Sequence, residues 1–204
     1  MDVTHPINTL IPSLAGAVLE VLAGTTRPLS GRQVARLVAG GATQKGVQKV
    51  LDELAHGGLV IQEEAGSAIL NLLNRHHLLA PLVVEAARGY RSFLDELGRT
   101  ASELQPQPER AVLFGSVARR EAGPGSDVDI ALVWSDALPP DAITNAEAAL
   151  RTRVEELTGN RCQIVSYRHS EFSNLAATAP EFAENLTKDG LDVFPRSDQE
   201  HLDT

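Results

Sequence analysis

Two short apolar segments within residues 110–134 frame a polar, glycine-rich stretch. The first segment ends at Gly115-Ser116, and the second begins with Asp127 and Asp129. Both are rich in residues that favour strands, and alternate residues of a strand share a face, so the two aspartates should point the same way. Two neighbouring carboxylates resist ionising together, and burial adds to that cost. The pattern therefore predicts two strands that present an anionic site to a compensating cation.

The Gly115-Ser116 turn is suited to a phosphate group, because it exposes backbone N–H groups beside a small hydroxyl. Mg²⁺ prefers oxygen ligands and commonly combines one or two carboxylates with substrate phosphates. A phosphate cradle beside a carboxylate pair is the arrangement that metal-assisted attack on a nucleotide α-phosphate requires. We therefore expect Mg²⁺ or Mn²⁺ and a nucleoside triphosphate, such as ATP, at this place.

The pattern Gly-Ser-x-Ala-Arg, a spacer, then Ser-Asp-x-Asp resembles the signature of the DNA polymerase beta-type nucleotidyltransferase superfamily, most closely its minimal bacterial and archaeal members. The resemblance covers about residues 108–196. It implies a small α/β domain with a mixed sheet, Mg²⁺-dependent binding of a nucleoside triphosphate, and transfer of a nucleotidyl group to a hydroxyl. The residues it implies are Gly115, Ser116, Arg119 and Ser126 for the nucleotide, and Asp127 and Asp129 as metal ligands and catalytic residues.

The same family uses a third carboxylate on a later strand, and this chain departs from that pattern. A helix expected over residues 140–159 leads into a strand in which Gln163 stands at the corresponding position. An amide oxygen ligates weakly and cannot accept a proton as a base, so one cation rather than two is expected. The neighbouring candidates are Glu155, Glu156, Glu171 and His169. The three glutamates are expected at solvated or helix-start positions, and His169 would serve as the base if it faces the cleft.

The first 74 residues predict a small helical module. Helical spacing runs from Leu10 to Leu22, Ser30 is placed to cap a short second helix, and Thr43 is placed to cap a third. Two short strands follow around an Ala-Gly-Ser turn. This order is typical of a winged helix-turn-helix, whose third helix lies in the DNA major groove.

Polar and basic residues dominate the second and third expected helices. Between Ser30 and Leu51 there are four basic residues and no acidic one. Glutamine reads adenine edges, and lysine or arginine holds phosphate or guanine. The predicted DNA-binding residues are Arg32, Arg36, Thr43, Gln44, Lys45, Gln48 and Lys49. The wing carries Glu63 and Glu64 where a phosphate-gripping wing would be basic, so a dimerisation or protein-docking module is the alternative.

The expected fold class is α+β, with a winged helix-turn-helix followed by a nucleotidyltransferase-like α/β domain. The expected boundaries are 1–74 for the helical module, 75–107 for a connecting helix and linker, 108–196 for the catalytic-type domain and 197–204 for a tail. Periodicity in the connecting helix is interrupted at Pro81 and Gly89.

Charge is distributed unevenly along the chain. The formal net charge is −9, and residues 1–80, with six basic and six acidic residues, contribute none of it. Cys162 is the only cysteine, which excludes an intrachain disulfide. The N-terminus lacks the basic start and apolar run of a signal peptide, and no apolar stretch approaches the length of a membrane span. We therefore expect a cytoplasmic protein with no membrane partner.

Three functions are consistent with these features. The first is an active nucleotidyltransferase that modifies a macromolecule or a small alcohol. The second is a DNA-binding transcriptional regulator whose transferase-like domain binds nucleotide with weak or no turnover. The third is a partner-binding protein, such as the antitoxin-like half of a pair. The presence of both Asp127 and Asp129 favours the first function, and Gln163 favours the second. Separately, the connecting helix is a candidate homodimer interface.

Overall fold

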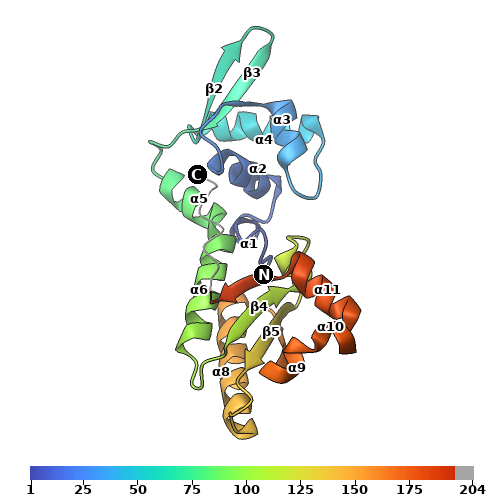
Figure 1. Cartoon of the computed structure of the whole chain (residues 1–204). Coiled ribbons are helices and arrows are strands. Elements are labelled where there is room, and N and C mark those ends of the chain that lie inside the picture. The colour runs from blue at the N-terminus through green and yellow to red at the C-terminus, as the bar shows by residue number, and fades with distance from the viewer. Residues whose placement is uncertain (196–204) are drawn as a thin grey trace. The chain divides into compact units, whose positions relative to one another are not determined.

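The computed structural model describes residues 1–195, whose contacts form two compact units (Figure 1). One unit spans His5–Tyr90. The other combines Met1–Thr4 with the chain from Arg91 onward, so the chain passes between the units twice. The second crossing falls inside the segment expected to connect the two modules. The expected tail, 197–204, lies outside the described residues.

The first unit contains five helices and a small sheet among its described residues. Its elements are α1 (Ile7–Leu10), α2 (Leu14–Ala23), β1 (Leu29–Ser30), α3 (Gly31–Leu37), α4 (Gln44–His56), β2 (Val60–Ala65), β3 (Ala68–Leu73) and α5 (Ala80–Ala87). The strands form an antiparallel sheet in the order β1-β3-β2. Ala65 pairs with Ala68 across a two-residue turn, so β2 and β3 make the predicted hairpin, which projects beyond the helices in Figure 1.

Local capping chemistry explains where these helices begin. Ser30 Oγ accepts a hydrogen bond from Gln33 N, and the Gln33 side chain bonds back, which makes a capping box at the start of α3. Thr43 Oγ1 accepts from Gly46 N at 3.1 Å at the start of α4. Both predicted caps are confirmed. The expected helix from Leu10 onward is wrong at its start, because α2 begins only after Ser13.

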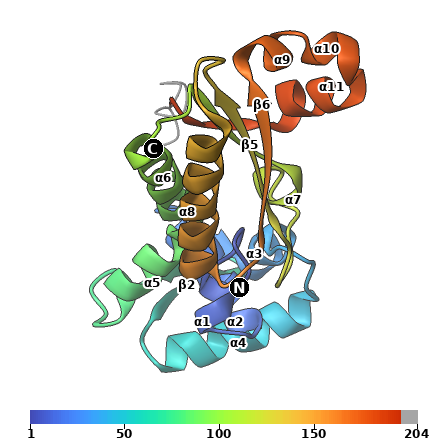
Figure 2. The same cartoon turned by 90° about the horizontal axis from the view of Figure 1, so that it is seen from below.

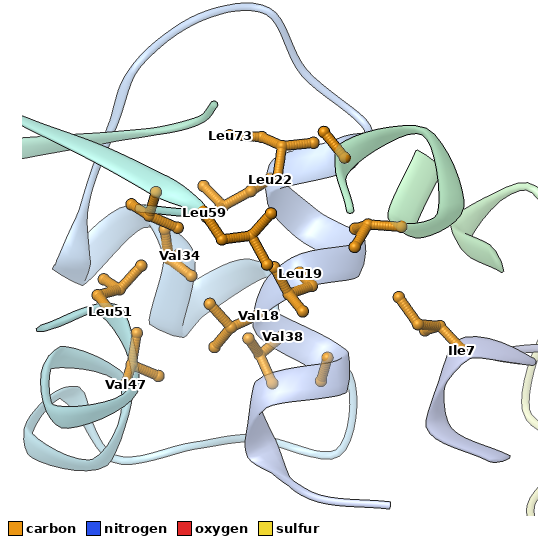
Figure 3. Packing of buried hydrophobic residues seen from close by; sticks show 14 residues of the cluster. Ile7, Val18, Leu19, Leu22, Val34, Val38, Val47, Leu51, Leu59 and Leu73 are labelled. Carbon is orange, nitrogen blue, oxygen red and sulfur yellow. The ribbon is translucent and has the colours of Figure 1, made fainter. Parts of the chain in front are cut away.

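Apolar side chains from all three central helices and the hairpin meet in one core (Figure 3). Fully buried members are Ile7, Val18, Leu22, Val34, Val47, Leu51 and Leu73. The inward residues of α4 are four apart, which is the spacing that keeps one helix face on a core. The exposed face of α4 is thereby free for other contacts.

The second unit is built on a four-stranded sheet. Its elements are α6 (Gly89–Glu103), β4 (Arg110–Phe114), α7 (Gly115–Ala118), β5 (Val128–Trp134), α8 (Pro140–Thr158), β6 (Cys162–Arg168), α9 (His169–Ser173), α10 (Leu175–Thr178), α11 (Pro180–Asp189) and β7 (Leu191–Phe194). The strand order is β6-β5-β4-β7, with β5 and β6 parallel and the other pairs antiparallel. The sheet is therefore mixed, as the sequence predicts.

Helices cover both faces of this sheet (Figure 2). On one side, α6 and α8 lie together, and Arg153 of α8 donates to Glu96 of α6 at 2.8 Å. On the other side, the helices α9 to α11 pack Leu175 and Leu186 against Val112 and Ala131 of the sheet. The central strand β5 is accordingly buried along most of its length.

The long helix expected over residues 75–104 is two helices. Pro81 lies in the first turn of α5, where proline removes no helical hydrogen bond, so it starts a helix rather than interrupting one. The interruption predicted at Gly89 is confirmed, because the break between α5 and α6 falls at Arg88–Gly89. Gly89 packs against Pro6, which leaves no room for a Cβ at that position.

Candidate functional site

The two aspartates lie at the start of the central strand β5. Asp127 immediately precedes the strand, and Asp129 is its second residue. In the sheet register, Asp129 stands opposite Phe114 of β4 on one side and Gln163 of β6 on the other. The register therefore brings Gly115, which follows Phe114, and Gln163 to the same end of the sheet as the carboxylates.

Gly115 is held against Asp129 in a conformation that other residues rarely adopt. Its φ is +73°, in the left-handed region. A Cβ at this position would also overlap the Oδ2 atom of Asp129. Glycine is thus required for two independent reasons, and the chain turns from β4 into α7 directly beside the second carboxylate.

The electrostatics of the pair follow from this crowding. Partial burial raises the pKa of Asp129 above its ordinary value, the nearby charge of Asp127 raises it further, and Arg119 partly opposes both. A carboxylate that is costly to ionise near a second one is stabilised by a cation placed between them. The arrangement of charges in the site therefore favours a bound cation.

Gln163 lies within this site and contacts it directly. Its Nε2 donates a hydrogen bond to Oδ2 of Asp127. An amide N–H stabilises the ionised carboxylate, but the side chain has no group that can take a proton from an attacking hydroxyl. The sequence expectation that Gln163 stands at the third position of the site agrees with its register beside Asp129.

The remaining residues expected to bind nucleotide lie in and after the short helix α7. Arg119 follows α7 and pairs with Glu121 at 2.8 Å, and its guanidinium lies 4.0 Å from Asp189 of α11. Ser116 belongs to α7 itself and is half-buried. Ser126 Oγ accepts a hydrogen bond from Gly123 N at 3.0 Å, so this hydroxyl closes the turn that leads into Asp127.

His169 is placed at the wrong end of β6 to act as the base. It follows the last residue of the strand, six positions beyond Gln163 or about 20 Å at the rise of an extended chain. Its Nδ1 lies 2.6 Å from Glu109, which raises the pKa of the imidazole.

The glutamates considered as substitutes are engaged elsewhere in the fold. Glu155 accepts from Cys162 N at 3.2 Å, and Glu171 accepts from Arg168 N at 2.7 Å. Glu156 lies 3.7 Å from Arg153 on the surface of α8. All three serve local structure, so none restores a third carboxylate.

The predicted DNA-binding residues lie on α3 and α4 of the first unit. Arg32, Arg36, Thr43, Gln44, Lys45 and Lys49 are exposed, and Gln48 is half-buried. Arg32, Gln44 and Gln48 line a groove of about 470 Å³ together with residues 67–69 at the tip of the hairpin. The structure thus brings three of the seven into one concave surface, with the others exposed nearby on the same helices.

Acidic residues follow directly on α4 and modify this surface. Asp52 Oδ1 accepts from Gln48 Nε2 at 2.9 Å and from Gln62 Nε2 at 3.1 Å. Glu53 lies 3.7 Å from Lys49. A count of charges that ends at Leu51 misses both carboxylates, although their i,i+4 spacing from Gln48 and Lys49 predicts the contacts.

Among the comparisons with known proteins, the family match falls in the second unit. Residues 99–199 match the family model described as polymerase beta, nucleotidyltransferase. This domain belongs to the polymerase beta-type nucleotidyltransferase family. No curated protein matches the chain. No helix among residues 1–195 has both the length and the apolar character needed to span a bilayer.

Two solved structures are similar to the chain at low identity. One is described as a toxin-antitoxin with AMP-PNP; it is 17% identical, has a TM-score of 0.37, and the match covers 52% of this chain and 75% of that one. The other is TrmBL2, an archaeal chromatin protein with a novel mode of DNA binding; it is 12% identical, has a TM-score of 0.31, and the match covers 88% of this chain and 76% of that one.

The donor set of the nucleotidyltransferase domain fits a divalent cation of the magnesium type. Within residues 1–195 no cluster of three or more histidine, cysteine or acidic side chains is present. The site instead offers the carboxylates of Asp127 and Asp129 and the amide oxygen of Gln163, all hard oxygen donors. Mg²⁺ is commonly held by one or two carboxylates while phosphates and water complete its shell. The residues present therefore fit one cation shared with a phosphate-bearing substrate.

One residue near the nucleotidyltransferase site gives little signal in the sequence. Asn160 is buried at 4% exposure, and its Nδ2 donates to the carbonyl of Ser126, the residue before Asp127, at 2.8 Å. In the sequence it follows Gly159, so the pair indicates only a turn after a helix. Its contact with a residue 34 positions earlier depends on the parallel pairing of β5 and β6.

Proposed function

We propose that the protein binds a nucleoside triphosphate together with Mg²⁺ or Mn²⁺ and transfers its nucleotidyl group to a hydroxyl acceptor, with pyrophosphate as the leaving group. One observation carries the proposal: the carboxylates of Asp127 and Asp129 begin the central strand beside the left-handed Gly115. The family match of the domain supports the same chemistry. A costly anionic pair beside a turn shaped for phosphate has a physical purpose only when both ligands bind.

Each residue has a distinct part in this proposal. When bound, the cation supplies Lewis-acid stabilisation of the phosphate charge. Asp127 and Asp129 hold it, Gly115 and Ser116 contact the triphosphate, and Ser126 fixes the turn before the first carboxylate. Arg119, which pairs with Glu121, is the guanidinium whose charge lowers the pKa of Asp129, and we assign it to the phosphates.

Proton removal is the weak step of the proposed reaction. Gln163 cannot act as a base, and His169 lies at the far end of its strand. General-base assistance typically contributes 10²–10⁴-fold to a rate. We therefore propose slow transfer, with the acceptor hydroxyl losing its proton to solvent or to a group of the acceptor.

Labelling tests the proposed activity. Incubation with Mg²⁺ and ATP labelled at its α-phosphate should label the protein or a supplied hydroxyl acceptor, and Asp129→Asn should abolish the label. Asp136→Asn is the matched control, because Asp136 is an exposed carboxylate outside the site, where it accepts from the backbone N and the hydroxyl of Ser170. Equal labelling of Asp129→Asn and wild type would contradict the proposal.

A restored carboxylate tests whether Gln163 limits the rate. Gln163→Asp should increase turnover strongly in a Mn²⁺ titration, because it returns both a third anionic ligand and a base to the place beside Asp129. If Gln163→Asp binds Mn²⁺ and nucleotide but gains no turnover, a residue other than Gln163 limits catalysis.

A second function is favoured by the first unit, which we propose to be a DNA-binding winged helix-turn-helix. The observation behind it is the groove between α3, α4 and the hairpin, lined by Arg32, Gln44 and Gln48. On this proposal the protein is a cytoplasmic transcriptional regulator, or an antitoxin-like regulator, whose transferase domain binds nucleotide with little turnover. A homodimer through the segment 75–104 would match a two-fold DNA site.

Electrophoretic mobility shifts test this second function. The intact protein should shift a duplex carrying its own promoter region, with an affinity that falls steeply as salt increases. Lys45→Glu/Lys49→Glu should remove the shift, whereas Arg88→Glu, an exposed charge reversal directly after α5, should not. A shift that persists in the double variant would exclude α4 as the contact helix.

A further inference from the structure

The segment Met1–Thr4 packs within the nucleotidyltransferase unit, although the residues after it belong to the other unit. Val3 and Thr4 are buried, at 0% and 2% exposure. The Thr4 hydroxyl lies 3.0 Å from the carbonyl oxygen of Ala122 and 2.9 Å from Oδ1 of Asp2, so these two acceptors share its single proton. Gly125 N donates to the Met1 carbonyl at 3.5 Å. We call Met1–Thr4 the strap. It contacts the loop of residues 121–126 at two separate points.

Asn160 joins the strap to the same loop from the other side. Its Nδ2 donates both to the carbonyl of Met1 at 3.0 Å and to the carbonyl of Ser126 at 2.8 Å. The Met1 nitrogen also donates to the carbonyl of Thr158 at 3.2 Å. A buried amide that satisfies two backbone carbonyls fixes their separation, because leaving either one unpaired is costly.

The loop that the strap holds is the one that presents Asp127. Its own support is slight: Ser126 N donates to Gly123 O at 3.1 Å, and Ser126 Oγ accepts from Gly123 N. Gly125 in the same loop has a φ of +81° with nothing near its Cβ position, so few side-chain contacts restrain it. On the strand side of Asp127, Val128 N donates to Arg161 O at 2.8 Å. On the loop side, the position of Asp127 depends on contacts from outside residues 121–126.

We propose that the strap and Asn160 are positioning elements that hold Asp127 at its distance from Asp129, so that cation binding and strap docking stabilise each other. The inference rests on the proposed function, because it needs the carboxylate pair to bind a cation. Thermodynamic linkage makes the effect reciprocal: a docked strap tightens cation binding, and a bound cation tightens the strap.

The strap is joined to the helical unit by a very short stretch of chain. Only His5 and Pro6 separate Thr4 from Ile7, which is fully buried in the core of the helical unit. A strap that docks more tightly therefore restrains the first helix of that unit as well. Cation and nucleotide binding at one unit would in this way reduce the motion of α1 in the unit proposed to bind DNA.

Isosteric variants of Thr4 test the positioning role through binding rather than activity. Thr4→Val keeps the shape but removes the hydroxyl, and Thr4→Ser keeps the hydroxyl. Mn²⁺ affinity, measured by electron paramagnetic resonance with a non-hydrolysable ATP analogue, should fall about two- to twelvefold in Thr4→Val, the range that one hydrogen bond supports, and recover in Thr4→Ser. Thr144→Val is the control, since Thr144 is exposed and its hydroxyl donates to Pro140 O within α8.

Amide hydrogen exchange provides the second measurement. It is made on the wild type, so a folding defect in a variant cannot affect it. In the wild type, Mn²⁺ with the ATP analogue should slow amide exchange in the strap and in residues 121–126, and leave the β2–β3 hairpin unchanged. Uptake of Mn²⁺ with unchanged exchange in the strap, or equal affinity in Thr4→Val and Thr144→Val, overturns the inference while the proposed function stands. Absence of Mn²⁺ and nucleotide uptake in the wild type overturns both.

Discussion

Replacing Gly115 by alanine separates two consequences that the structure assigns to this one residue. The left-handed φ of +73° should cost about 1–2 kcal/mol of unfolding free energy for any residue with a Cβ. The added Cβ would also overlap Oδ2 of Asp129, and that atom is the mobile end of a side chain. Asp129 should therefore swing away from the site while the backbone stays in place.

Displacement of the Asp129 carboxylate should lower the affinity for Mn²⁺ rather than the free energy of unfolding. Interactions with charged groups contribute about 1.5–3 kcal/mol, so losing Asp129 as a ligand should weaken Mn²⁺ binding about 10- to 100-fold. Gly159→Ala is the matched control: it has a φ of +68° and nothing within 4 Å of its Cβ position. Denaturant unfolding and Mn²⁺ titration with an ATP analogue would be measured on both variants.

The two variants should lose similar stability, and only Gly115→Ala should lose affinity for Mn²⁺. If Gly115→Ala binds Mn²⁺ as tightly as Gly159→Ala, then Asp129 is not a ligand and the geometry assigned to the site is wrong. If Gly115→Ala is much less stable than the control, the backbone rather than the side chain has moved.

Three further predictions concern groups outside this site. Burial raises the pKa of Cys162 to about 12, so at mildly alkaline pH its thiol should react with a disulfide reagent about a thousandfold more slowly in the native protein than after unfolding. The contact with Glu109 raises the pKa of His169, so Glu109→Gln should lower that pKa in an NMR titration; the raised pKa means that the contact stabilises the fold at pH below the ordinary histidine pKa and is lost as pH rises through the folded value. Leu51→Ala, at 0% exposure, should cost about 2–5 kcal/mol of unfolding free energy, whereas Leu37→Ala, at 60% exposure, should stay within about 0.5 kcal/mol.

Local patterns in the sequence were sufficient for most of the elements. The strands on either side of Gly115 and Asp127, the β2–β3 hairpin and the caps at Ser30 and Thr43 all agree with prediction. Each depends on spacing or on a capping residue within a few positions of the element itself. The family match confirmed the nucleotidyltransferase resemblance that the glycine, serine and aspartate spacing indicated.

Local patterns in the sequence did not predict features that depend on contacts between distant residues. His169 follows a strand of the right kind, but its place along β6 puts it far from the carboxylates, and only the register shows this. The contacts of Asn160 with the strap join residues far apart in the sequence, and no local pattern contains them. Leu10 was assigned to the first long helix by its spacing, yet it is exposed because Ser13 starts that helix later.

Calorimetric titration of the intact protein with ATP tests the central claim most directly, namely that Asp127 and Asp129 are held together for a cation and a phosphate chain. The account predicts heat of binding in the presence of Mg²⁺ that disappears with a chelator and in Asp129→Asn. Equal binding with and without Mg²⁺, or no binding under either condition, would contradict it.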